Sequence, residues 1–179
     1  NKILFKDLFK LEEGNKQSSK VEDNPDGNGL FINKGPKNNW QKILNKDCRI
    51  NGENIFIATA SNGNQTIPIR YHYGPCDFSN CMARLIVNDK YKDKINLIFY
   101  YNLLLELKPY LEKYFQSGAC NKKLNIERLM GFYLPFPSIE DQECSRDEYN
   151  KIDNEINIIE HNLKLLKDKR NNILINKYT

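Results

Sequence analysis

The feature of this 179-residue sequence that most limits its fold is the final segment, residues 139–179, which contains neither Gly nor Pro. Apolar residues recur there at alternating intervals of three and four, the heptad spacing of a coiled-coil helix. Such a helix would extend for about 60 Å, too far for the rest of the chain to cover. We therefore expect much of its apolar stripe to pack against another helix. The residues expected to pair with that helix are Ile152, Ile156, Ile159, Leu163, Leu166 and Ile173.

The stripe leaves two arrangements open, because it either pairs with a separate helix or packs against its own domain. Ile158 and Leu165 widen the apolar face enough for contact with more than one helix. Arg170 and Lys177 occupy a positions of the heptad, where a polar residue weakens a coiled coil or fixes its register. We favour a helix that assembles with another helix.

The segment before the helix, GFYLPFPSIEDQ, predicts a stiff joint. Pro135 and Pro137 exclude both a helix and a central strand. Ser138, followed three residues later by Asp141, resembles a capping box, in which the serine side chain bonds to the backbone at the start of a helix. We therefore expect the joint to stop the last strand of a domain and to start the helix at a fixed angle.

The sequence predicts an α+β fold, with a mixed α/β domain over residues 1–138 and one long coiled-coil helix over residues 139–179. Alternating apolar runs predict strands at 29–35, 54–60, 66–73 and 82–88. Helices are expected at 94–116, disturbed at Pro109, and at 125–130. The expected core consists of Ile55, Ile57, Ile69, Leu85, Val87, Ile98, Leu104 and Leu105.

Charge is unevenly divided between the two parts. The net charge of +4 consists of +6 on residues 1–138 and −2 on residues 139–179. A basic domain favours a polyanionic partner. Its polar loops are rich in Lys, Asn, Gln and Ser, which bind phosphates and base edges in protein–DNA complexes. For any single loop, simple solvation is at least as good an explanation. The residues expected to contact DNA are Lys16, Gln17, Ser18, Lys34, Lys37, Asn38, Asn39, Asn62, Asn64, Gln65, Arg70, Lys122 and Lys123.

No catalytic signature occurs in the sequence, which lacks the G-x-G-x-x-G, P-loop, H-E-x-x-H and G-x-S-x-G motifs. His72 and His161 are the only histidines, and a structural role is expected for His72. The five cysteines lack metal-ligand spacing, so free thiols in a reducing, intracellular compartment are expected. No apolar run is long enough to span a membrane. We therefore expect no catalytic residues, no cofactor and no metal ion.

The segment SGACNKKLNIERLMGFYLPFPSIEDQ resembles the end of a target recognition domain in the DNA specificity subunits of type I restriction–modification systems. The segments DLFKLEEGNKQSSK and NGENIFIATASNGNQTIPIR resemble, more loosely, the opening and central strands of such a domain. Cys120, Asn121 and Asp141 differ from the residues usual in the family. The positions that carry the resemblance are Gly118, Ala119, Asn121, Leu124, Asn125, Leu129, Pro135, Pro137 and Gln142.

This resemblance implies sequence-specific recognition of double-stranded DNA within a cytoplasmic restriction–modification complex. The helix would be the spacer that pairs in the antiparallel sense with a second such helix and docks the modification subunits. One domain and one helix would form half of a specificity subunit. Such a half is a fragment of a larger subunit, a natural half-subunit that forms a homodimer, or the recognition part of a fused enzyme. Catalysis would then come from a modification (methyltransferase) subunit or a fused domain.

Two other classes of function are alternatives. The first is a non-catalytic protein–protein interaction domain that oligomerises through its helix, and the second is a nuclease or methyltransferase. Tight binding to one short DNA sequence, weakening steeply with salt, separates recognition from the first alternative. Activity of the purified chain with Mg²⁺ or S-adenosylmethionine would reveal the second.

Overall fold

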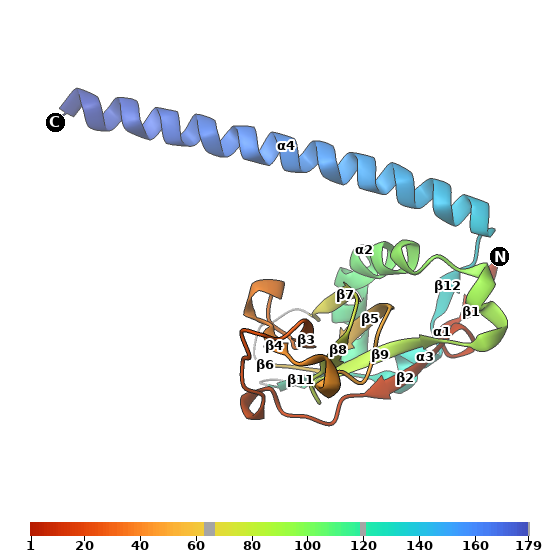
Figure 1. Ribbon diagram of the computed structural model, residues 1–179. Helices are drawn as coiled ribbons and strands as arrows, with labels where there is room; N and C mark the ends of the chain where they lie inside the picture. Colours follow the sequence, from red (N-terminus) through yellow and green to blue (C-terminus); the bar gives the residue numbers. More distant parts are fainter. Residues whose placement is uncertain (63–66, 119–120, 179) are drawn as a thin grey trace.

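The computed structural model describes residues 1–62, 67–118 and 121–178, and it shows a mixed α/β body from which one long helix projects (Figure 1). This architecture confirms the predicted α+β fold. None of the described helices is both long and apolar enough to cross a lipid bilayer.

A four-stranded antiparallel sheet forms the centre of the body. Its strands lie in the order β2 (Phe9–Glu13), β9 (Met82–Val87), β5 (Glu53–Ala58) and β7 (Ile69–Tyr73). Helix α2 (Leu97–Phe115) contacts β5 and β7, and Asn96 caps it by accepting a hydrogen bond from the Phe99 N–H at 3.1 Å.

Three smaller sheets complete the body. One contains β4 (Gln41–Ile43), β3 (Gly29–Ile32) and β8 (Cys76–Phe78), with β3 and β8 parallel. Another contains β10 (Gln116–Ser117), β11 (Asn121–Leu124) and β6 (Ala60–Asn62). The third pairs β1 (Lys2–Leu4) with β12 (Tyr133–Pro135), so that the chain's first strand lies beside its last.

Short helices connect the strands. The α-helices are α1 (Phe5–Leu8) and α3 (Ile126–Met130). The 3₁₀ helices are η1 (Ser18–Lys20), η2 (Lys37–Asn39), η3 (Asn45–Asp47) and η4 (Asp89–Lys94). Helix α3 confirms the short helix predicted at 125–130, with Asn125 as its cap.

The predicted strands are present but shorter than expected, and two of the differences have a local cause. β3 stops at Ile32 because the Asn33 side chain accepts a hydrogen bond from the Gly35 N–H at 2.7 Å and turns the chain. The predicted strand at 54–60 divides at Thr59. Its N–H bonds to Cys81, whereas its carbonyl accepts from Leu124, so the chain leaves one sheet for another at this residue.

Helix α2 begins at Leu97 and ends at Phe115, inside the predicted limits of 94 and 116. It continues through Pro109, which was expected to disturb it. A proline removes one main-chain hydrogen bond, and the helix keeps its packing on the sheet on both sides of that residue: Leu104 and Leu111 are both fully buried.

The core agrees largely with the sequence expectation. The buried members of the predicted set are Ile55, Ile57, Ile69, Leu85 and Leu104, and the half-buried members are Val87, Ile98 and Leu105. The prediction missed Phe5, Leu8, Phe9 and Tyr100, which are fully buried in the same cluster. These residues join the N-terminal segment to the sheet, so residues far apart in sequence share one core.

Helix α4 (Ile139–Tyr178) is continuous, which confirms the long helix predicted after the joint. Ser138 caps it as expected: the Ser138 Oγ accepts from the Asp141 N–H at 3.1 Å. The Asp141 carboxylate accepts in turn from the Ser138 hydroxyl at 3.0 Å. The capping therefore places the helix start directly after the proline-stiffened segment.

Gln142 locks the joint to the body. Its side chain is fully buried, and its Oε1 accepts from the Asn96 N–H at 2.8 Å, at the start of α2. Its Nε2 donates to the Lys94 and Pro137 carbonyls at 3.0 and 3.1 Å. Two turns further along α4, the Tyr149 hydroxyl lies 3.4 Å from the Glu106 carboxylate on α2. These contacts fix the direction in which α4 leaves the body.

Beyond Tyr149 the apolar stripe lies in solvent. In Figure 1, α4 leads from the joint along the length of the body and past its opposite end, diverging from the body on the way. The exposed fractions extend from 47% for Ile156 to 64% for Ile159. Ile152, Leu163 and Leu166 lie between these values, whereas the side chain of Ile173 lies outside the described part of the helix. The alternative in which the stripe packs on its own body is therefore wrong for residues 152–166.

Candidate nucleic-acid interface

Described segments that carry predicted DNA contacts lie at one end of the body. Figure 1 shows β3, β4, β6 and β11 at the end opposite the chain's N-terminus and the start of α4. Helix η2, between β3 and β4, presents Lys37, Asn38 and Asn39, all exposed. Strand β11 carries Lys122, half-buried, and Lys123, exposed. The body thus offers cations and amides at the end farthest from the joint.

Gln41, on β4, links two of the loops. Its Nε2 donates to the Ser18 carbonyl at 3.3 Å, and its Oε1 accepts from the Asn33 Nδ2 at 3.2 Å. The same Asn33 Nδ2 lies 3.3 Å from the Asn39 carbonyl. The loop that carries Gln17 and Ser18 is therefore held beside the loop that leads to η2.

Arg70, another predicted DNA contact, instead binds the backbone of the loop that follows β3. Its Nη2 donates to the Lys34 carbonyl at 2.9 Å and its Nε to the Gly35 carbonyl at 3.2 Å. The Trp40 indole N–H reaches the same Gly35 carbonyl at 3.1 Å. Burial lowers the pKa of the Arg70 guanidinium. Its donors are engaged with the backbone, so the geometry supports positioning of the loop rather than direct contact with a phosphate.

Lys16 reaches solvent but is already paired, because its ammonium lies 2.8 Å from the fully buried carboxylate of Asp77. Arg49 bonds the other Asp77 oxygen through Nε at 2.7 Å and Nη2 at 2.6 Å. Burial alone would raise the pKa of Asp77, but the hydrogen bonds from Arg49 and Lys16 hold that pKa below its usual value. Lys16 and Arg49 thus bring the segment before η1 and the segment after η3 onto β8.

Three predicted residues have no described side chain. The backbone of Asn62 lies in β6, paired with Asn121 of β11. Asn64 and Gln65 lie outside the described residues. Their assignment to DNA contact therefore stays a prediction.

Three exposed lysines on neighbouring segments were not among the predicted contacts: Lys20 in η1, Lys42 in β4 and Lys46 in η3. Each follows a polar residue in the sequence, as several predicted contacts do, so composition alone does not distinguish them. The fold is needed to find them, because only the fold shows which cations are exposed and which are paired with buried carboxylates.

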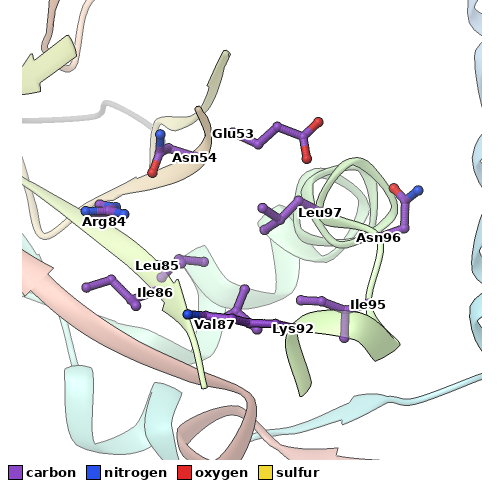
Figure 2. A pocket seen from close by; sticks show the side chains of 10 residues that line it. All are labelled: Glu53, Asn54, Arg84, Leu85, Ile86, Val87, Lys92, Ile95, Asn96 and Leu97. Carbon is purple, nitrogen blue, oxygen red and sulfur yellow. The ribbon is translucent and has the colours of Figure 1, made fainter. Parts of the chain in front are cut away.

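A cavity of about 370 Å³ opens between the sheet and the start of α2. Figure 2 shows side chains from β5, β9 and the segment before α2 around it. Its carboxylate, Glu53, accepts from the Tyr71 hydroxyl at 2.6 Å, and its arginine, Arg84, pairs with Glu12 at 3.1 Å. Both charged side chains are therefore engaged by residues of neighbouring strands. Within residues 1–62, 67–118 and 121–178, no group of three or more His, Cys, Asp or Glu is placed to hold a metal ion.

Comparison with solved structures identifies the fold. The S subunit of the type I restriction–modification system of M. genitalium superposes with a TM-score of 0.66 at 18% identity, over 86% of this chain and 39% of that one. The HsdS subunit of Thermoanaerobacter tengcongensis gives a TM-score of 0.60 at 16% identity, over 87% of this chain and 38% of that one. A third structure, from work on assembly and conformational transition of the type I R-M system, gives 0.61 at 16% identity, over 89% and 39%. The chain thus spans less than half the length of these proteins.

No curated protein matches the chain. A family model described as the type I restriction modification DNA specificity domain matches residues 2–168, which include the body, the joint and most of α4. The chain therefore belongs to the family of type I restriction modification DNA specificity domains.

Proposed function

We propose that residues 1–138 recognise one part of a specific sequence in double-stranded DNA, as the specificity module of a restriction–modification complex. Family membership supports this proposal. The observation that carries it is the cluster of exposed cations and amides at one end of the body, on loops tied together by Gln41 and Arg70. Lysines supply affinity through phosphates, whereas amides read base edges.

We propose further that residues 139–179 form the spacer, which pairs with an equivalent helix in the antiparallel sense. The exposed stripe of α4 supports pairing. Charge supports the direction, because residues 139–160 carry a net charge of −6 and residues 161–179 a net charge of +4. Antiparallel pairing sets the acidic part of each helix against the basic part of the other, whereas parallel pairing sets like charges together.

Catalysis is assigned to other parts of the complex. We propose that a modification (methyltransferase) subunit or a fused domain supplies it, inside the cell where the DNA lies. The chain itself then needs neither a cofactor nor a metal ion. Selection of bound sites from a random double-stranded library, with the purified chain and its modification partner, tests recognition directly. Enrichment of no sequence, with binding that does not respond to salt, would favour a protein-binding domain instead.

Replacing Lys123 by alanine is expected to weaken binding to the selected site and to unrelated DNA by a similar factor. Loss of one phosphate contact should also reduce the slope of log K against log salt by about 1. Replacing Asn64 or Gln65 by alanine is expected to act differently, relaxing the choice of base at one position. Fluorescence anisotropy over a salt series, with matched and mismatched duplexes, separates the two outcomes.

Lys2→Ala is the matched control for Lys123→Ala. Lys2 is an exposed lysine on β1, at the end of the body where the chain begins (Figure 1). It should leave both the affinity and the salt slope unchanged. Equal effects of Lys2→Ala and Lys123→Ala would mean that the proposed end of the body has no special part in DNA binding.

A chain cut after Ser138 is expected to fold but to bind its site weakly. The buried core cluster of the body lies entirely before the cut. Loss of the spacer removes the second recognition half, and with it a gain in affinity of about a hundredfold or more from effective concentration. Thermal unfolding checks the fold and anisotropy checks the affinity. A truncated chain with undiminished affinity would show that α4 has no role in recognition.

A further inference from the structure

A groove of about 150 Å³ lies between α2 and α4, one turn beyond the joint. Its wall is mainly apolar, and Tyr149 forms one end of it. The side chains that line it are Phe99, Asn102, Leu103 and Glu106 on α2, and Ser145, Arg146 and Tyr149 on α4.

Two polar side chains of this groove can form further hydrogen bonds or ion pairs. Asn102 is 8% exposed, and its amide nitrogen has no hydrogen-bond partner among the described residues. Glu106 is exposed and lies 3.4 Å from the Tyr149 hydroxyl, but it forms no ion pair with any described Lys or Arg. The nearby Arg146 is bound to Asp147 at 2.7 Å. A buried polar group without a partner is destabilising, so the groove suits a polar side chain with an apolar stem.

Ser145 and Tyr149 continue the heptad of the stripe towards the joint, at d and a positions. In an antiparallel pair, each a position of one helix packs near a d position of the other. If Ile156 faces the Ile159 of a second copy, then Ile152 faces Leu163 and Tyr149 faces Leu166. In this register Ser145 faces Arg170, the one polar residue that interrupts the stripe.

Neighbouring registers fit less well. A shift by one heptad in one direction sets Arg170 against Ile152, which buries a guanidinium against an aliphatic side chain. A shift in the other direction sets Leu163 against Ser145 and carries Arg170 past the groove to Ser138. Only the first register both delivers Arg170 to the groove and pairs Tyr149, Ile152 and Ile156 with apolar residues.

We propose that the groove between α2 and α4 receives Arg170 from a second copy of this chain, and thereby sets the register of the antiparallel pair. The aliphatic stem lies along Phe99 and Leu103, and the guanidinium reaches the Glu106 carboxylate. The Asn102 amide can present its oxygen to the same guanidinium by a half-turn about its last bond, because its oxygen and nitrogen have nearly the same size. This assignment rests on the proposed antiparallel pairing.

The register of the helix pair affects DNA recognition. A shift of one heptad slides one helix along the other by about 10 Å. The two recognition domains sit at opposite ends of the pair, so the same shift changes the distance between the two DNA segments that they reach. A contact that selects one register therefore selects one spacing.

Engineered disulfides test the register in the full-length chain. Cys144 is exposed, so the background carries Cys144→Ser. Ile152→Cys combined with Leu163→Cys, which face each other in the proposed register and leave Arg170 in place, is expected to give a covalent dimer on oxidation. Ile156→Cys combined with Leu166→Cys, which reports the shifted register, should give little. Electrophoresis without reductant distinguishes them, and preferential cross-linking of the second pair would overturn the assignment.

A charge exchange tests the Arg170–Glu106 contact itself. Arg170→Glu alone and Glu106→Arg alone should each weaken dimerisation about tenfold, and the two together should restore it, as expected for charges in contact. Lys164→Glu, on the outer side of α4, is the matched control. Combining it with Glu106→Arg should not restore the dimer affinity that Glu106→Arg loses. A dimer whose affinity is not restored by the exchange refutes the groove assignment but leaves the pairing intact. A parent chain that is monomeric at every concentration refutes both.

Discussion

Ile159→Asp is expected to convert a chain that dimerises into a monomer at micromolar concentration. Ile159 is 64% exposed in the isolated chain and lies near the middle of the stripe. Each copy of the variant forgoes roughly 1.5–3 kcal/mol of apolar burial and places an unpaired carboxylate in the seam. With two copies in each dimer, the dissociation constant should rise by more than about a hundredfold. Sedimentation equilibrium over a range of concentrations measures the change.

Asn154→Asp is the matched control for Ile159→Asp. It adds the same charge to the same helix, at an exposed position turned away from the stripe, and should leave the dimer intact. Circular dichroism should show that both variants keep their helix. If the parent and Ile159→Asp have the same mass at every concentration, the stripe does not pair copies of this chain.

The sequence predicted those parts of the fold that depend on neighbours in the chain. The heptad, the absence of Gly and Pro, and the Ser138 cap together predict α4, and each acts within a few residues. The β-strands follow from alternating apolar residues, whose burial depends on the local pleat. The ends of β3 and β5 were less predictable, because a side-chain turn at Asn33 and a change of partner strand at Thr59 decide them.

The candidate interface was predictable in composition but not in detail. Lys16 and Arg70 have the same chemistry in the sequence as Lys37 and Lys123. Their charges are turned inward by partners far away in the chain, namely the Asp77 carboxylate and the Lys34 and Gly35 carbonyls. Such pairings arise only when the sheets assemble. For the same reason, the role of Gln142 in locking the joint could not be predicted from its position in the motif.

Asp77→Ala is expected to lower the free energy of unfolding by about 3 kcal/mol, near the lower end of the range for breaking a buried ion pair. Asp77 is fully buried and accepts hydrogen bonds from Arg49 and from the Phe78 N–H, with Lys16 on its other oxygen. Without it, two cations lose their counter-ion, although both reach solvent and are partly compensated by water. The melting temperature should fall by about 10 °C, as differential scanning calorimetry would show.

The same carboxylate gives the protein a specific sensitivity to acid, which Asp77→Asn should remove. The pKa of Asp77 is lower in the folded chain than in the unfolded chain. The ionised carboxylate therefore adds its full contribution to the free energy of unfolding at pH values above the unfolded pKa of about 3.9. That contribution is lost as the pH falls through the lower, folded value. The parent should therefore lose stability more steeply below about pH 4 than Asp77→Asn does.

Asp89→Asn is the control for Asp77→Asn. Asp89 forms an exposed pair with Lys92, so its replacement should leave the unfolding curve nearly unchanged. If Asp77→Asn lowered the free energy of unfolding at neutral pH as little as Asp89→Asn does, the buried carboxylate would not be what holds the Lys16 and Arg49 segments on β8.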